Sequence, residues 1–285
     1  MILSHLLVIA SVLGLAGCAF SGADPSAPGP FQIIQLTQLL PTDAILLGEQ
    51  HDAPDHQRIH RISVEALASQ HTLAALALEM ASQGQSTQTL ERHASEDQVR
   101  AALQWDNDAW PWAAYGPAVM AAVRAGVPVI GANLPVARLR DAMANADFDR
   151  LLAGPALKAQ QQQIRRGHCE LLPESQISPM TRIQIARDVT MAQTVAGAAR
   201  PGKTVVLLAG SGHVDRTLGV PLHLPPGFKV KAVLLHAEQA PDATKNSAEF
   251  DQFWPARPAP LVDYCADFTA RQARRASEFV TRQGP

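Results

Sequence analysis

Five short apolar runs, separated by stretches with helical periodicity, constrain the fold of this chain more than any other feature. The runs cover residues 44–48, 73–80, 127–131, 204–208 and 230–235. The helical patterns lie near 54–68, 112–125, 135–145, 155–167 and 177–199. Strands that are apolar along their whole length and alternate with helices are typical of a parallel sheet covered on both faces. The sequence therefore predicts an α/β fold, a parallel sheet flanked by helices.

The remaining segments predict how this domain is bounded. Residues 18–30 are rich in Ser, Gly, Ala and Pro, which is typical of a flexible tether. We expect one α/β domain over residues 31–285, since 47% of the chain is hydrophobic, enough for a sizeable core. The span from about 136 to 200 is helical without a convincing strand, so it predicts a smaller helical cap. The Pro/Ala-rich segment 254–260 predicts an extended tail that crosses the surface.

The first 17 residues resemble a bacterial lipoprotein signal peptide. An apolar run over residues 2–15 is too short for a stable spanning helix, and it ends in the sequence LAGC at Cys18. Small residues before a cysteine predict cleavage before Cys18 and acylation of its thiol, although an ordinary secretory signal also fits. The acyl chains would anchor the mature chain in a membrane. Ala19 stands where aspartate usually marks inner-membrane retention, which favours the outer membrane.

Charge and hydropathy exclude two classes of protein. The chain has 24 Lys and Arg against 26 Asp and Glu, a net charge of −2. It therefore has no basic excess to neutralise a nucleic-acid backbone, and we expect no nucleic-acid partner. After residue 17 no long apolar stretch follows, which excludes a polytopic membrane protein.

The three cysteines predict one disulfide. Three are too few for a disulfide scaffold. If Cys18 is acylated, Cys169 and Cys265 remain as an even pair in an oxidising compartment. We expect them to form a disulfide that ties the helical cap to the C-terminal tail, and two buried free thiols are the alternative.

Polar residues follow four of the apolar runs at the point where each ends. They are Glu49 with His51, Glu79, Asn133 and His213. The carboxyl ends of parallel strands lie along one edge of a sheet, where open α/β folds build their sites. These side chains are therefore expected to converge in one crevice. In the alternative interpretation each is a loop residue with local hydrogen-bond partners.

Two further groups of side chains have more than one interpretation. His56 and His60 are four residues apart on a helix, so they share a face and, with His51, have metal-ligand spacing. The chain has no His-Glu-x-x-His motif, which favours two surface residues on a polar helix instead. Trp105, Trp110, Trp112 and Tyr115 crowd into eleven residues and form either an apolar wall for a flat ligand or an anchor for their loop.

Six motifs occur in the order of a known family. They are residues 47–51, 78–80, 112–117, 128–135, 184–188 with 191–192, and 209–213 followed by 219–221. Together they resemble the ChaN-like haem-binding uptake lipoproteins over roughly residues 40–265. More distantly the chain is similar to erythromycin-esterase-like and TIKI-type hydrolases, which share Gly-Glu-x-His and Gly-His elements. The resemblance implies an α/β fold with a helical subdomain and a haem bound for iron acquisition.

The same resemblance implies the residues that hold the haem. It implies a tyrosine as the iron ligand and two haems face to face in a dimer. Tyr115 lies in a matched motif and is favoured over Tyr264, the other tyrosine. A phenolate is an anionic ligand suited to ferric iron. The other expected cofactor-binding residues are His51 and His213, near the propionates or as alternative ligands, with Glu49, Glu79 and Asn133.

Two functions remain open at this point. The first is a haem-binding outer-membrane lipoprotein that binds without turnover, dimerises with haem and has an outer-membrane haem receptor as a partner. The second is a hydrolase in which Glu49 or Glu79 acts as general base, while His51 and His213 act as acid or metal ligands.

Overall fold

The computed structural model describes residues 30–237, 248–260, 262–266 and 269–270. The predicted signal peptide, Cys18 and residues 19–29 of the predicted tether lie outside the described residues. Within the described part of the chain, no helix combines the length and apolarity needed to cross a membrane.

The core of the fold is a six-stranded sheet in the order β3-β2-β4-β1-β5-β6, in which every neighbouring pair is parallel. The predicted α/β class is confirmed. The strands are β1 (Ala44–Glu49), β2 (Leu73–Ser82), β3 (Val129–Asn133), β4 (Thr204–Gly210), β5 (Val230–Ala237) and β6 (Gln252–Ala256).

The prediction of an extended tail over 254–260 is wrong for its first residues, which belong to strand β6. Its residues pair with β5 at one edge of the sheet, and Trp254 is buried there. Pro255 is tolerated because an edge strand has one side without ladder partners. The proline interrupts the strand and conceals it in the pattern of apolar runs.

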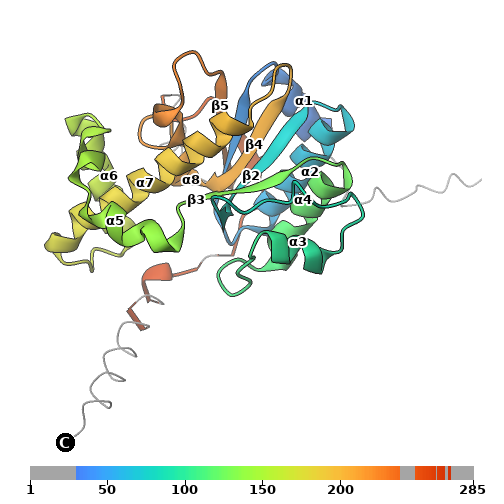
Figure 1. The fold of residues 1–285 in the computed structure, drawn as a ribbon. Helices are drawn as coiled ribbons and strands as arrows, with labels where there is room; N and C mark the ends of the chain where they lie inside the picture. The colour runs from blue at the N-terminus through green and yellow to red at the C-terminus, as the bar shows by residue number, and fades with distance from the viewer. Residues whose placement is uncertain (1–29, 238–247, 261, 267–268, 271–285) are drawn as a thin grey trace, which may run out of the picture.

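Helices cover both faces of the sheet (Figure 1). Side chains alternate along β1: Ile45 and Leu47 pack in a core with helices α1, α2 and α4, whereas Ala44 and Leu46 pack with α7 on the other face. The helices are α1 (Pro30–Gln38), α2 (Pro54–Ser69), α3 (Glu96–Ala102), α4 (Trp112–Arg124), α5 (Leu139–Ala144), α6 (Gly154–Gly167), α7 (Glu174–Ala198) and α8 (Ser211–Val214), with short 3₁₀ turns η1 (Val136–Arg138), η2 (Ala146–Arg150) and η3 (Val220–His223).

The segment between β3 and β4 is helical, as expected for the cap. Helices α5 and α6 contact α7 and lie beside the sheet (Figure 1). A small apolar cluster of Leu134, Ala142 and Ala186 joins α5 to α7. Met191 and Val195, in the C-terminal half of α7, belong instead to the core against the sheet. Helix α7 is therefore shared between the cap and the sheet layer.

Candidate functional site

Three neighbouring strands bring the acidic and imidazole side chains to one edge of the sheet. The order β2-β4-β1 places the carboxyl ends of these strands side by side, and Glu49 pairs in register with Gly210. Glu79 lies near the end of β2, where the register with β3 shifts. His213 lies on α8, which begins directly after β4. The structure thus brings Glu49, Glu79 and His213 together at one edge of the sheet.

Glu49 is the most heavily contacted of these groups. Its carboxylate is buried, and its Oε1 accepts hydrogen bonds from Tyr115 Oη at 2.6 Å and from His51 Nδ1 at 2.8 Å. Gln57 Nε2 donates to Oε2 at 3.4 Å. A buried carboxylate needs several such donors to offset the loss of water. Glu49 is therefore a fixed hydrogen-bond acceptor behind His51.

His51 is the exposed member of the site. Its side chain keeps 41% of its surface accessible, and its Nε2 lies 3.9 Å from Glu79 Oε2. Burial lowers the pKa of His51, but the hydrogen bond with Glu49 and the charges of Glu79 and Glu49 outweigh it, so the pKa lies above its usual value. The edge of Trp110 packs against the imidazole with ring centroids 4.8 Å apart. His51 is thus an accessible imidazole backed by carboxylates.

Glu79 connects the two halves of the site. Its Oε2 accepts from the Gly210 amide at 2.7 Å, and its Oε1 lies 3.4 Å from His213 Nε2. Burial raises the pKa of Glu79, but the charge of His213, with the hydrogen bonds, lowers it to about 2. Asn133 binds the backbone rather than the carboxylate, since its amide donates to the Glu79 carbonyl at 2.9 Å. Asn133 therefore fixes the end of β2 against β3.

His213 lies between two carboxylates. Its Nδ1 is 2.5 Å from Asp188 Oδ1, and Glu79 faces its other nitrogen. Burial lowers the pKa of His213, but the charges of Glu79 and Asp188 raise it to about 10. Burial raises the pKa of Asp188 to about 6, and its Oδ2 has no hydrogen-bond partner among the described residues. His213 is thus a buried cation.

Asp188 is a member of the site that the sequence pattern does not single out. It lies within a matched motif on α7, and only the packing of that helix on the sheet edge brings it to His213. The five groups alternate between acid and imidazole along the edge: Glu49, His51, Glu79, His213 and Asp188. Such a chain can hold and exchange protons between an accessible imidazole and a buried one.

The two tyrosines differ in how they present their phenols. Tyr115, on α4, is only 2% exposed and donates its hydroxyl to Glu49. Burial and the neighbouring Glu49 carboxylate raise its pKa, so its phenolate form is disfavoured. Tyr264 is 50% exposed, donates to Asp52 and accepts from Gln50 Nε2 at 3.2 Å. The accessible phenol beside the site is therefore that of Tyr264.

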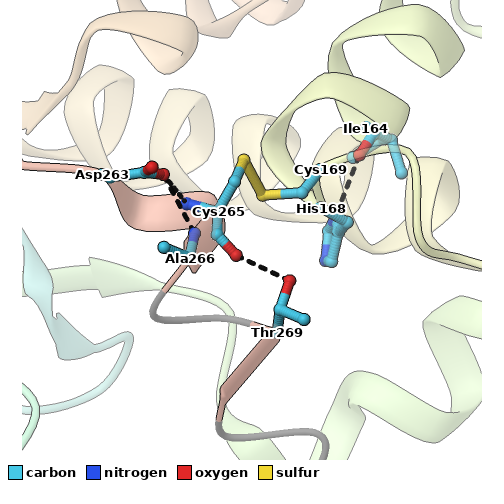
Figure 2. Close-up of a disulfide and its surroundings, with 7 residues drawn as sticks. All are labelled: Ile164, His168, Cys169, Asp263, Cys265, Ala266 and Thr269. Atoms are coloured by element: carbon cyan, nitrogen blue, oxygen red, sulfur yellow. Dashed lines mark hydrogen bonds between the residues drawn. A yellow bond between two sulfur atoms is a disulfide. The ribbon is translucent and has the colours of Figure 1, made fainter.

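The described residues after β6, at 257–260 and 262–266, form the tail that carries Tyr264, and a disulfide holds it. Cys265 is bonded to Cys169, which follows α6, and their Cα atoms lie 5.5 Å apart (Figure 2). Asp263 Oδ1 accepts from the amides of Cys265 and Ala266 at 3.1 and 2.9 Å. The bond joins the cap to the tail next to the residues that follow β1.

The interpretation of His56 and His60 as surface residues is wrong, because both are buried on helix α2. It begins at Pro54, as expected, but His56 and His60 are only 3% and 1% exposed. His56 Nδ1 accepts from the Gln50 amide at 3.0 Å, and His60 Nδ1 lies 3.6 Å from Glu49 Oε2. Burial lowers the pKa of His60 to about 4, so it is neutral near pH 7. The residues that the structure describes contain no group of three or more His, Cys, Asp or Glu arranged to hold a metal ion.

The tryptophans mainly anchor their own loop. Trp105 Nε1 donates to the Trp110 carbonyl at 2.8 Å, and Trp112 Nε1 donates to Glu96 at 2.7 Å. Trp105 and Trp110 both pack on the Tyr115 ring. Among the tryptophans of this loop, Trp110 is the one whose ring contacts His51. It therefore joins the aromatic loop to the site.

Replacing Gly210 by Ala is expected to move His51 without unfolding the chain. A Cβ at Gly210 would lie 2.9 Å from His51 Nε2, which is the free end of a half-exposed side chain. The imidazole would move away from Glu79, and we expect the pKa of His51 to fall towards its usual value. NMR titration of the His51 ring measures this. Gly197→Ala, whose Cβ meets no atom within 4 Å, is the matched control, and an unchanged His51 titration in Gly210→Ala would contradict the geometry.

Two of the larger cavities lined by described residues lie away from the carboxyl edge. One, of about 590 Å³, lies between the 83–88 segment, β3 and the end of α7. The other, of about 660 Å³, lies between α2 and α4. Neither is lined by Glu49, His51, Glu79 or His213. They are therefore alternative locations for a ligand.

Comparison with known proteins gives one family and several similar folds. Residues 35–224 match the family model described as haem-binding uptake, Tiki superfamily, ChaN. A solved structure titled as cofacial haem binding to ChaN of Campylobacter jejuni is 24% identical, covers 79% of this chain and 91% of its own, and has a TM-score of 0.65. Two more distant folds are the erythromycin esterase EreC (14% identity, 71% and 72% coverage, TM-score 0.41) and the type III effector HopBA1 (17%, 70% and 79%, 0.39). No curated protein matches the chain.

Proposed function

Since the chain belongs to the haem-binding uptake family of the Tiki superfamily, which includes ChaN, we propose that it is a haem-binding lipoprotein of the bacterial outer membrane. The observation that carries the proposal is the family match over residues 35–224, which contains the carboxyl-edge site from Glu49 to His213. The protein holds haem as cargo for iron acquisition, without turnover. An outer-membrane haem receptor is the partner that this role requires.

The side chains at the carboxyl edge fit haem. Haem needs an accessible axial ligand, apolar contact and polar partners for its propionates. Tyr264 offers the phenol, and His51, whose raised pKa favours its protonated form, offers a hydrogen-bond donor for a propionate. Large apolar side chains are unusually exposed in the segments that follow β3, follow Cys169 or precede Tyr264, namely Val136, Leu171 and Val262. These features support haem at this edge.

We assign the iron ligand to Tyr264 rather than to Tyr115. Burial and a hydrogen bond to Asp52 raise the pKa of the Tyr264 phenol too, but its oxygen is accessible, so ferric iron can replace its proton. The Tyr115 hydroxyl is buried and already donates its hydrogen bond to Glu49. Tyr115 instead stabilises the carboxylate that orients His51. His213, buried between two carboxylates, contributes charge rather than direct contact.

An open site of this kind leaves one face of a flat ligand uncovered. A second copy of the chain would cover it and bury the apolar side chains around the edge. We propose that two haems then lie face to face in a homodimer. Sedimentation of the protein with and without haemin tests this, and a mass that stays monomeric at saturation argues against it.

Membrane attachment rests on Cys18. Acylation of its thiol by fatty acids such as palmitate would anchor the mature chain, and Ala19 favours the outer membrane. Cys18→Ala is expected to give an uncleaved precursor or a protein that is released from the membrane fraction. Cell fractionation checks this, with Cys169→Ala as the matched cysteine variant. An outer-membrane protein of mature length in Cys18→Ala would contradict the anchor.

Haemin titration of the purified mature protein tests the function itself. Haem binding predicts a saturable change in the Soret band. A linear response, equal to that of an unrelated protein, would contradict haem binding.

One observation favours a hydrolase as the second candidate. The accessible His51 imidazole has Glu49 on its Nδ1, the arrangement in which a carboxylate orients a general base. His51 would take a proton from water, and Glu79 and His213 would exchange it with the buried groups. Assays with ester and lactone substrates test this candidate. Hydrolysis that is lost in both His51→Ala and Glu49→Gln would support it.

A further inference from the structure

We propose that the Cys169–Cys265 disulfide is a redox-sensitive strap that holds Tyr264 at the carboxyl-edge site and thereby sets how long bound haem is retained. The inference rests on the proposed function and adds a means of regulation to it. It concerns a covalent link between the cap and the tail, two segments that are 96 residues apart in sequence.

Two neighbouring residues attach the tail: Cys265 through the disulfide and Tyr264 through the hydrogen bonds of its phenol. Cys265 is bonded to Cys169 at the end of the cap helix α6 (Figure 2). Tyr264, the preceding residue, bonds to Gln50 and Asp52, which flank His51 in sequence. The tail is therefore held from one side by the cap and from the other by the loop after β1.

Few other contacts hold the described tail: besides the hydrogen bonds of Tyr264, the Arg257 amide donates to Asp55 Oδ2 at 2.8 Å. After Ala256 at the end of β6, none of the described residues belongs to a core cluster. Val262 and Tyr264 are 42% and 50% exposed. Hydrogen bonds of exposed groups exchange readily with water. The disulfide is thus the contact whose loss would free Tyr264.

The chemistry of release needs only a dithiol reductant. A thiolate of the reductant attacks one sulfur of the disulfide, which gives a mixed disulfide and one free cysteine thiolate. The second thiol of the reductant then displaces the other cysteine. Two electrons pass to Cys169 and Cys265, which become thiols after protonation, and the reductant becomes a disulfide. Cys265 is an exposed residue, which is consistent with access of a reductant to the disulfide.

Haem transfer to apomyoglobin measures the effect. The haemin complex of the Cys169→Ser/Cys265→Ser variant is expected to transfer haem about tenfold faster or more than oxidised wild type. Dithiothreitol should accelerate transfer from wild type to the same extent and leave the double variant unchanged. This second arm separates reduction of the disulfide from any action of the thiol on haem. If the double variant does not fold, Tyr264→Phe, which keeps the disulfide but lacks the phenol, takes its place as the control, and dithiothreitol is expected to leave its transfer rate unchanged.

A measurement without haem completes the design. In the apoprotein, hydrogen exchange at residues 262–266 is expected to increase when the disulfide is absent, and to stay unchanged in Tyr264→Phe with the disulfide intact. Equal transfer rates in oxidised wild type and the double variant would overturn the strap while leaving haem binding intact. Absence of saturable haemin binding by oxidised wild type would overturn the proposed function and the strap with it.

Discussion

Replacing Tyr264 by Phe is expected to weaken haemin binding by about 10–100-fold or more, because loss of an outer-sphere partner alone costs that much at metal sites. The substitution removes the accessible phenol oxygen and leaves the ring, the disulfide and the neighbouring apolar side chains in place. The ferric haem spectrum should change from that of an oxygen-ligated iron to that of a weaker or different axial ligand. Haemin titration and the visible spectrum measure both effects.

Tyr115→Phe is the matched control for this experiment. It removes the hydroxyl that donates to Glu49 at 2.6 Å, so we expect a loss of about 1–3 kcal/mol in the free energy of unfolding. The ferric haem spectrum should stay as in wild type. If Tyr115→Phe changes the spectrum and Tyr264→Phe does not, the ligand assignment is reversed.

Replacing His213 by Ala is expected to destabilise the protein by about 3–5 kcal/mol, the usual cost of removing one partner from a buried ion pair. The substitution leaves Glu79 and Asp188 buried without the cation between them. Urea unfolding near neutral pH measures the loss. His93→Ala, at an exposed position, should stay within about 0.5 kcal/mol of wild type.

The pH dependence of this loss follows mainly from His213 and Glu79, the two groups whose pKa shifts favour the charged form. Folding raises the pKa of His213 from 6.5 to about 10, so its stabilising contribution is complete below pH 6.5 and is lost as the pH rises towards 10. Folding lowers the pKa of Glu79 from 4.5 to about 2, so its contribution is present above pH 4.5 and is lost as the pH falls. The difference between wild type and His213→Ala should therefore be largest between pH 4.5 and 6.5. A loss below about 1 kcal/mol in that range would show that His213 is not a buried cation.

Elements with a strong apolar pattern are predictable from the sequence. Five of the strands are apolar along their length, and a parallel arrangement of strands then fixes which polar residues share an edge. That rule alone predicts that Glu49, Glu79 and His213 lie close together. Strand β6 escapes the prediction because proline weakens its pattern. Helix α3 escapes it too, although Ser95 and Gln98 form a capping box that marks its start.

Features that depend on the packing of distant segments are not predictable in this way. The sequence shows two tyrosines but not which one is enclosed, and Tyr264 reaches the site because the tail returns to it. His60 has the sequence context of a surface histidine, yet α2 turns it inwards to Glu49. Asp188 lies 25 residues before His213, and the packing of α7 against the sheet edge makes them partners.

The location of haem is the central claim, and amide NMR spectra with the diamagnetic haem analogue gallium protoporphyrin test it most directly. We predict that the largest shifts fall on the carboxyl edge, at residues 49–52, 79, 110, 210–213 and 264–265. Shifts confined to residues that line the cavity beside the 83–88 segment, or the cavity between α2 and α4, would contradict the claim.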